Sequence, residues 1–220
     1  MTLDIEMLTV GQIGENCFLF RPQGGDRLLI VDPGEEAERI LAAAAEMGEV
    51  EAILLTHCHF DHIGAVAPIA KATGAPVWCP EIEAPVLADI NSFVPWPGFG
   101  PFESYDADET VEGGERLQLA GLDIDVIFTP GHSPGHVTYS FDPPSGGQGA
   151  GALLSGDVLF QGSVGRTDLP GADHATLMES IATLLERFDD DTKVHPGHMG
   201  LTTLGRERSS NPFLQALAGR

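Results

Sequence analysis

Residues 51–64 read EAILLTHCHFDHIG, and this stretch decides the fold. Glu51–Leu55 is a short apolar run of the kind that forms a buried strand. Four side chains able to bind metal follow it within six residues. By strand alternation, His57 and His59 are expected to project to the same side and to hold one ion. Asp61 and His62 come where the chain turns into a helix, and we expect them to face a second position nearby.

Three more predicted strands end in side chains of the same chemistry. The loop TPGHSPGH at 129–136 contains His132, LSGD at 154–157 ends in Asp157, and VHPGH at 194–198 ends in His198. Strand ends are where open α/β layers place their active sites, so these loops are expected to meet. His195 is a second candidate in the last loop. His136 and His174 are expected to be structural or solvent-facing.

Periodicity and turn residues predict one domain over 1–220, without a linker, built of two similar layers that face each other. The predicted helices cover Glu35–Met47, Asp61–Thr73, Pro80–Ile90, Thr176–Phe188 and a tail from Arg206 that is broken at Pro212. The predicted strands cover Asp4–Val10, Asn16–Arg21, Arg27–Val31, Glu51–Leu55, Pro76–Cys79, Arg116–Leu119, Ile124–Thr129, Val137–Asp142, Gly151–Ser155 and Lys193–His195, with a turn at Pro143–Gly149.

The composition excludes several classes of protein. Eleven basic residues against 33 acidic ones give a net charge of −22, which repels phosphate backbones and argues against a nucleic-acid partner. No apolar run has the roughly 18–20 residues needed to span a membrane, and the N-terminus lacks a basic leader. Three cysteines without a CxxC spacing indicate a reducing, cytoplasmic environment. The sequence leaves the oligomeric state open.

The motifs THCHFDH, PGHSPGH, SGDVLF and the final PGH resemble the metallo-β-lactamase superfamily over nearly the whole chain. The run GSVGRTDLPG at 162–171 resembles the glyoxalase II (hydroxyacylglutathione hydrolase) branch, particularly its short bacterial members. The resemblance implies an α+β fold of the αββα sandwich type, in which two mixed sheets face each other and are flanked by helices.

The resemblance also implies a site for two divalent metal ions, with Zn expected and Fe or Mn as alternatives because the same ligands suit all three. Each ion would keep an open position for water. The implied ligands are His57, His59 and His132 for the first metal, Asp61, His62 and His198 for the second, and Asp157 as the bridge between them.

The implied activity is hydrolysis of a thioester, such as S-lactoylglutathione or a related hydroxyacyl-thiol. A hydroxide shared by the metals would attack the carbonyl carbon, and Asp61 would orient it. Only 22 residues follow His198, with Arg206, Arg208 and Arg220 as their basic side chains, so a thiol other than glutathione is also considered.

Two rival functions follow from the same resemblance. A persulfide dioxygenase would use one iron held by His57, His132 and Asp157, and a lactonase or other ester hydrolase would share the two-metal site. Arg166 either pairs with Asp168 or also meets a substrate anion. The aromatic segment Asn91–Tyr105 is a candidate wall for a substrate pocket.

Overall fold

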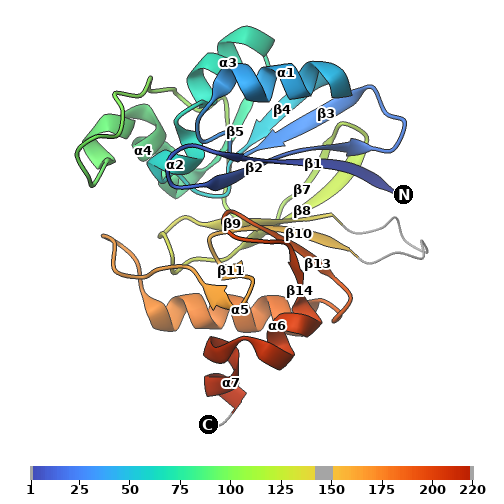
Figure 1. Ribbon diagram of the computed structural model, residues 1–220, viewed down its shortest axis with the longest axis vertical. Helices are drawn as coiled ribbons and strands as arrows, with labels where there is room; N and C mark the ends of the chain where they lie inside the picture. The colour runs from blue at the N-terminus through green and yellow to red at the C-terminus, as the bar shows by residue number, and fades with distance from the viewer. Residues whose placement is uncertain (1, 142–150, 219–220) are drawn as a thin grey trace.

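Two six-stranded sheets face each other in the computed structural model, which describes residues 2–141 and 151–218 (Figure 1). The first sheet has the order β1-β2-β3-β4-β5-β6. Its first three strands are antiparallel neighbours, whereas β3 to β6 run parallel. The strands are β1 Leu3–Val10, β2 Glu15–Pro22, β3 Arg27–Val31, β4 Glu49–Leu54, β5 Val77–Pro80 and β6 Glu109–Val111.

The second sheet has the order β14-β13-β10-β9-β8-β7, in which only the β10–β13 pair is parallel. Its strands are β7 Arg116–Leu119, β8 Leu122–Phe128, β9 Val137–Phe141, β10 Ala152–Gly156, β13 Lys193–Pro196 and β14 Thr202–Thr203. A small hairpin of β11 Leu159–Phe160 and β12 Ser163–Val164 stands beside it. Both sheets are therefore mixed, as the resemblance implies.

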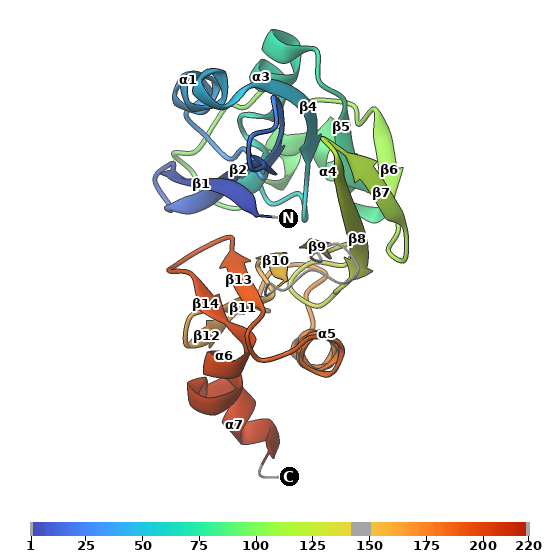
Figure 2. The same cartoon turned by 90° about the vertical axis from the view of Figure 1, so that its right-hand side faces the viewer.

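Helices cover the outer face of each sheet, so the molecule has four layers (Figures 1 and 2). Helices α1 Ala37–Met47 and α3 Val66–Thr73 cover the first sheet. Helices α5 His174–Arg187, α6 Leu204–Ser210 and α7 Pro212–Ala218 lie on the side of the second sheet. Helix α1 buries Ile40, Ala44 and Met47, a spacing that places all three on one helical face.

Three apolar cores correspond to these layers. The first lies under α1 and α3, the second lies between the sheets, and the third lies under α5 and α6. Between the sheets the rings of Phe20 and Phe141 meet edge to face, with centroids 4.3 Å apart. The hydroxyl of Tyr139 donates to the carbonyl oxygen of Leu55 at 2.9 Å, which ties β9 to the loop that carries the first histidines.

Most predicted strands are observed within two residues of their bounds, and Arg27–Val31 and Arg116–Leu119 agree in full. The single helix predicted over Asp61–Thr73 is wrong, because α2 Phe60–Ile63 and α3 are separated at Gly64 and Ala65. The backbone of Gly64 lies so close to Gly34 that an added Cβ would be 2.5 Å from the Gly34 carbonyl oxygen. This approach of two loops is a tertiary contact that local periodicity does not encode.

The helix predicted over Pro80–Ile90 is shorter than expected. Only α4 Ala84–Ala88 is α-helical, and the 3-10 turns η1 Glu81–Glu83 and η2 Ile90–Phe93 flank it. The short strands β6, β11, β12 and β14 were not predicted, since two or three residues carry no readable alternation. Asp142 and the predicted turn at Pro143–Gly149 lie outside the described residues. Within 2–141 and 151–218, no helix is long and apolar enough to cross a membrane.

Candidate metal centre

Four loops meet at one edge of the facing sheets and carry the predicted ligands. They follow β4, β8, β10 and β13, as the positions of the motifs predicted. Strand β4 ends at Leu54, three residues before His57, so strand alternation is not what orients His57 and His59. The loop itself and its hydrogen bonds orient them. The two side chains do lie close together, as predicted, but strand alternation is the wrong reason for it.

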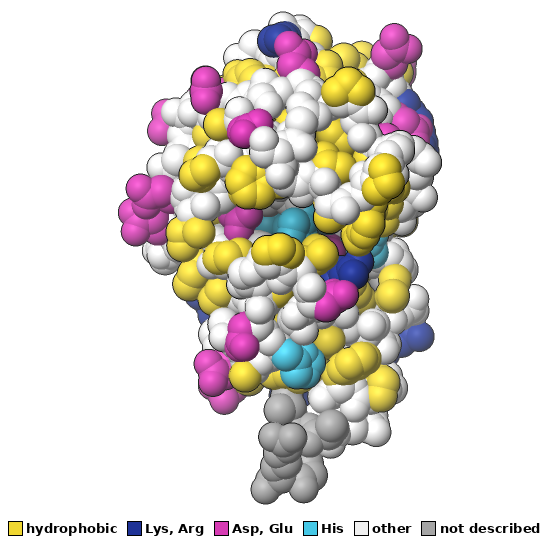
Figure 3. Space-filling model, turned by 90° about the vertical axis from the view of Figure 1, so that its left-hand side faces the viewer, with side chains coloured by type: hydrophobic (Ala, Val, Ile, Leu, Met, Phe, Trp, Pro, Cys, Tyr) yellow, Lys and Arg dark blue, Asp and Glu magenta, His cyan; other side chains and the backbone are white. Residues whose placement is uncertain are grey.

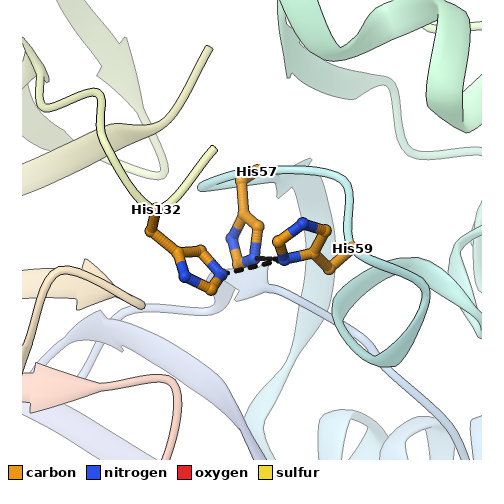
Figure 4. Close-up of side chains that lie close together, drawn as sticks. All are labelled: His57, His59 and His132. Atoms are coloured by element: carbon orange, nitrogen blue, oxygen red, sulfur yellow. Dashed lines mark hydrogen bonds between the residues drawn. The ribbon is translucent and has the colours of Figure 1, made fainter. Parts of the chain in front are cut away.

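The first cluster consists of His57, His59 and His132, whose ring nitrogens converge (Figure 4). His57 Nε2 lies 3.1 Å from His59 Nδ1, and His59 Nδ1 lies 2.8 Å from His132 Nε2. His57 and His132 are buried, and His59 is partly exposed. Residues 73 positions apart in the chain are thus brought to one point.

The second cluster consists of Asp61, His62 and His198. Asp61 Oδ2 lies 3.3 Å from His198 Nε2 and 4.0 Å from His62 Nε2. His62 is fully buried, whereas the side chains of Asp61 and His198 are 13% and 17% exposed and face the open side of the site. A ligand that enters from solvent would therefore meet Asp61 and His198 first.

Asp157 lies between the two clusters and reaches both. Its Oδ1 is 3.4 Å from His62 Nε2, and its Oδ2 is 3.4 Å from His132 Nε2 and 3.6 Å from His198 Nε2. A carboxylate whose oxygens reach ring nitrogens of both clusters has the placement of a bridging ligand. All seven side chains predicted as ligands are brought together, and their role as ligands stays a prediction.

Hydrogen bonds behind the first cluster determine which nitrogen of His57 is free. Thr56 Oγ1 donates to Asp32 Oδ2 at 2.6 Å and lies 3.1 Å from His57 Nδ1. Because the hydroxyl proton is used on the carboxylate, His57 must donate from Nδ1, which leaves the Nε2 lone pair facing the cluster. Asp32 also accepts from the backbone N–H of Thr56 at 2.7 Å.

Three other histidines of the clusters are oriented in the same way. His132 Nδ1 donates to the carbonyl oxygen of Arg166 at 2.8 Å, and His198 Nδ1 faces that of Gly14 at 3.3 Å. His62 Nδ1 lies 3.1 Å from Asp32 Oδ2. Carbonyl and carboxylate oxygens only accept, so the Nε2 atoms are the ones turned to the clusters. Asp32 also lies within ligand distance of His57 and His62, but its oxygens are occupied by these donors.

The three remaining histidines do not belong to the clusters. His136 Nε2 accepts from the backbone N–H of Asp157 at 3.1 Å, so it positions that loop. His195 is buried with its ring edge-on to Phe18, at a centroid distance of 5.5 Å. The structure therefore places His198, and not His195, beside Asp61. His174 is the exposed first residue of α5.

The donor set fits cations. In the first cluster His59 Nδ1 lies within hydrogen-bond distance of both His57 Nε2 and His132 Nε2, yet the tautomers of His57 and His132 leave no proton on those Nε2 atoms. His62 Nε2 and Asp157 Oδ1 are buried and have no hydrogen-bond partner in the protein. Unpaired buried lone pairs are costly, and a divalent cation in each cluster would satisfy them.

The electrostatics of the first cluster and of Asp157 agree with this fit. Burial and the neighbouring His132 lower the pKa of His59 to about 3, and burial also lowers the pKa of His57, so both rings are neutral at pH 7. Burial opposes ionisation of Asp157, but His62 and His132 hold its pKa well below the usual range. The second cluster differs: burial disfavours the charged form of His198, yet Asp61 and Asp157 raise its pKa, so a cation that binds there would displace a proton from this ring. Neutral imidazoles and ionised carboxylates are the forms that bind metals.

Sequence reasoning missed Glu83, which connects the two loops of the first cluster. Its Oε1 accepts from the backbone N–H of Gly135 at 2.7 Å, and its Oε2 faces that of Cys58 at 3.4 Å. In the sequence Glu83 looks like an ordinary acidic residue of a surface helix, and no local signal marks it. Cys58 lies between the two histidines in the sequence but points into the first core, with its Sγ 3.4 Å from that of Cys79.

Glu15 was also missed. Its carboxyl is buried, both oxygens have no hydrogen-bond partner in the protein, and one lies 3.8 Å from His62 Nδ1. Burial raises the pKa of Glu15 well above its usual value, although His62 opposes the shift. Glu15 stands at the start of β2, where the sequence shows only the beginning of a strand.

An open cleft of about 820 Å³ lies over both clusters. Figure 3 shows histidine side chains in a hollow that is bordered by hydrophobic side chains. Arg166 lines the cleft, and its Nε and Nη2 donate to the two carboxylate oxygens of Asp168 at 2.7 and 2.8 Å. The predicted ion pair is thus observed. Phe93 and Trp96 from the aromatic segment also line the cleft, as expected for that segment.

Comparison with known proteins agrees with the geometry. Residues 10–198 match the model of the metallo-beta-lactamase superfamily. The chain is 33% identical over 228 residues to the hydroxyacylglutathione hydrolase GloC of Haemophilus influenzae, which covers 97% of this chain and 99% of that protein.

Two crystal structures are similar over nearly their whole length. The B3 metallo-beta-lactamase BLEG-1 is 36% identical with a TM-score of 0.87, covering 96% of this chain and 99% of that one. TTHA1623 in a di-iron-bound form is 41% identical with a TM-score of 0.80, covering 95% and 100%. With the matching fold and the clustered histidines and aspartates, the chain belongs to the metallo-β-lactamase superfamily of metallohydrolases.

Proposed function

We propose that the protein hydrolyses a hydroxyacyl thioester, such as S-lactoylglutathione or a related hydroxyacyl-thiol. One water and the thioester give one hydroxy acid and one thiol. The observation that carries the proposal is the placement of Asp157 between two ligand clusters at the floor of an open cleft. The similarity to GloC, a hydroxyacylglutathione hydrolase, supports the choice of a thioester.

The two clusters would hold two divalent cations, with His57, His59 and His132 at one, Asp61, His62 and His198 at the other, and Asp157 at both. We propose zinc, with iron or manganese as alternatives that the same donors accept. When bound, such a pair of cations lowers the pKa of water to about 7 and polarises a carbonyl oxygen. The similar TTHA1623 is known in a di-iron form.

The protein residues supply orientation and a proton acceptor. Burial opposes ionisation of Asp61, but the contact with His198 holds its pKa below the usual value, so at pH 7 it is an acceptor only. Asp61 Oδ2 on the open side of the site can therefore accept a hydrogen bond from the attacking water. This hydrogen bond directs a lone pair of the water oxygen to the substrate. The departing thiol has an ordinary pKa of about 8.5, so it leaves as thiolate without a dedicated acid.

The second cluster favours hydrolysis over persulfide oxidation by a single iron. Such an oxidation would use only His57, His132 and Asp157 as ligands. The second cluster, Asp61, His62 and His198, would then have no role in the reaction. These three donor groups nevertheless lie within ligand distance of one another. Retention of a complete second donor set is expected of a two-metal hydrolase.

Anaerobic turnover of S-lactoylglutathione, with thiol release measured and metals counted per chain, tests the proposal. We expect about two metals per chain and oxygen-independent thiol release. Asp61→Asn should lower kcat by about 100-fold or more, on the scale of losing a positioned proton acceptor. Asp106→Asn changes an exposed aspartate that lies far from Asp61 in the chain, and it should leave kcat unchanged. If the protein holds one iron per chain and consumes oxygen in the presence of glutathione persulfide, its activity is that of a dioxygenase and the proposed hydrolysis is wrong.

A second candidate activity is hydrolysis of β-lactams, which the similarity to BLEG-1 favours. The same arrangement of water and acceptor would attack a lactam carbonyl. Turnover of a chromogenic cephalosporin under the same conditions decides between the two candidates. A kcat/KM for the cephalosporin above that for every thioester tested would make the β-lactam the preferred substrate.

A further inference from the structure

Exposed apolar side chains gather around the mouth of the cleft. Of the ten large hydrophobic side chains that are exposed among the described residues, half line this cleft. We call these five the apolar rim: Ile13, Ile82, Phe93, Trp96 and Met199. Single exposed hydrophobics are ordinary on a protein surface, whereas a group of them around a hollow indicates a binding site.

The rim is assembled from separate parts of the chain. Ile13 comes from the β1–β2 turn, Ile82 from η1, Phe93 from η2 and Met199 from the loop after β13. Met199 is 55% exposed and has a backbone φ of 68°, a conformation that costs energy for a residue with a side chain. Buried Asn16 holds this turn by donating to the carbonyl oxygens of Pro196 and Met199.

The cleft offers almost no positive charge outside the proposed metals. Arg166 is the one lysine or arginine among the described residues that line it. Its guanidinium is already paired with both carboxylate oxygens of Asp168, and it lies over the Trp96 ring at 5.3 Å. The two carboxylates of a glutathione carrier would thus meet no unpaired cation here, and the net charge of −22 would repel them.

We propose that the substrate is a hydroxyacyl thioester whose thiol half is apolar and uncharged, so that its hydrocarbon lies on the apolar rim. The inference rests on the proposed thioester hydrolysis. The hydroxyl of a 2-hydroxyacyl group such as lactoyl is carried by the carbon next to the carbonyl carbon, so it stays beside the histidines and aspartates of the clusters. The thiol half is the part that extends outward to the rim. A cleft of about 820 Å³ is of the size that takes small molecules.

The test compares lactoyl thioesters of three thiols on the metal-loaded protein: glutathione, N-acetylcysteamine and benzyl mercaptan. Each kcat/KM is divided by the rate constant of alkaline hydrolysis, which removes the effect of the leaving group. We expect the benzyl thioester to exceed S-lactoylglutathione by about tenfold or more, the scale of a buried hydrocarbon group. N-acetylcysteamine should fall between them.

Phe93→Ala is the diagnostic variant, and Phe213→Ala, at an exposed phenylalanine outside the cleft, is its matched control. Phe93→Ala should lower kcat/KM for the benzyl thioester by about tenfold more than it lowers kcat/KM for S-lactoylglutathione. Phe213→Ala should change neither. Equal or better turnover of S-lactoylglutathione, or an unchanged benzyl preference in Phe93→Ala, overturns the inference.

Calorimetry with two thioethers separates this inference from the proposed function. Benzyl 2-hydroxypropyl sulfide and S-(2-hydroxypropyl)glutathione cannot be hydrolysed, so their binding does not depend on catalysis. Tighter binding of the benzyl compound, with a negative heat-capacity change, supports the apolar rim even if no thioester is turned over. In that case the proposed function alone fails. Equal binding of the two thioethers rejects the rim as a substrate site. A change in the sedimentation coefficient caused by Phe93→Ala also rejects it and makes the rim a protein interface.

Discussion

Thr56 is the residue on which the orientation of His57 depends. It stands between Asp32 and His57: its hydroxyl donates a hydrogen bond to the Asp32 carboxylate and accepts one from Nδ1–H of the His57 ring. Partners of this kind raise the basicity of a metal-binding imidazole and hold its ring in place.

Thr56→Val removes the hydroxyl and keeps the shape of the side chain. We expect metal affinity to fall by about 10- to 100-fold, as for other residues that orient a ligand histidine. Competition with a coloured chelator measures the affinity. Thr56→Ser keeps the hydroxyl, so its metal affinity should stay within a few-fold of that of the wild type. An equal loss of metal affinity in both variants would contradict this role of Thr56.

His195 gives the protein a pH-dependent stability that is separate from metal binding. Burial lowers its pKa to about 4, although a backbone hydrogen bond with Leu153 opposes the shift. In the unfolded chain its pKa is about 6.5, so the unfolded state binds more protons between these values. Stability is thus complete above about pH 6.5 and is lost as the pH falls toward 4.

In metal-free protein, the free energy of unfolding should fall by about 2 kcal/mol from pH 7 to pH 5 through this one group. Urea denaturation at both pH values checks it. His195→Leu should remove that part of the pH dependence, whatever its effect on stability at pH 7. His174→Leu, at an exposed histidine, should retain the full dependence, and identical slopes in both variants would refute the assignment.

Helix α5 is the element that positions the His132 loop. The backbone N–H of Asp173 donates to the carbonyl oxygen of Gly131 at 2.8 Å, and Ser180 Oγ donates to that of Pro130 at 2.7 Å. Gly131 has φ 129°, and an added Cβ would lie 2.2 Å from the backbone nitrogen of Leu177. Only a glycine permits this approach of loop and helix.

Gly131→Ala should therefore separate α5 from the loop and displace His132. We expect it to be less stable than Gly114→Ala by about 2 kcal/mol or more, because strain and steric overlap add. Gly114 has φ 103° with nothing within 4 Å of an added Cβ, so it controls for the backbone conformation alone. Urea unfolding and metal content measure the two variants. Equal stability and full metal content in Gly131→Ala would contradict the role of the contact.

The two sheet layers of the whole molecule meet at the candidate metal centre. His57, His59, Asp61 and His62 come from the layer of the first sheet, and His132, Asp157 and His198 come from that of the second. A cation bound by both layers stabilises the folded state, because the unfolded chain does not hold these donors together.

Removal of metal by a chelator should lower Tm by about 5–10 °C relative to protein with free metal at 100 times its Kd. The difference between metal-bound and metal-free protein should shrink in Asp157→Asn, which removes the carboxylate between the clusters. Differential scanning calorimetry measures both. A Tm that does not change on chelation would show that the clusters do not bind cations in the folded protein.

The sequence by itself determined the types and the strand-end positions of the seven predicted ligands, because short apolar runs and turn residues are local signals. It also determined the two-layer order of strands and helices. Tertiary structure alone decided that His198 and not His195 faces Asp61, that Thr56, Asp32 and Glu83 hold the loops, and that the helix breaks at Gly64. It also decided that five distant hydrophobic residues form one rim. Those features depend on contacts between residues far apart in the chain, and local periodicity carries no information about such contacts.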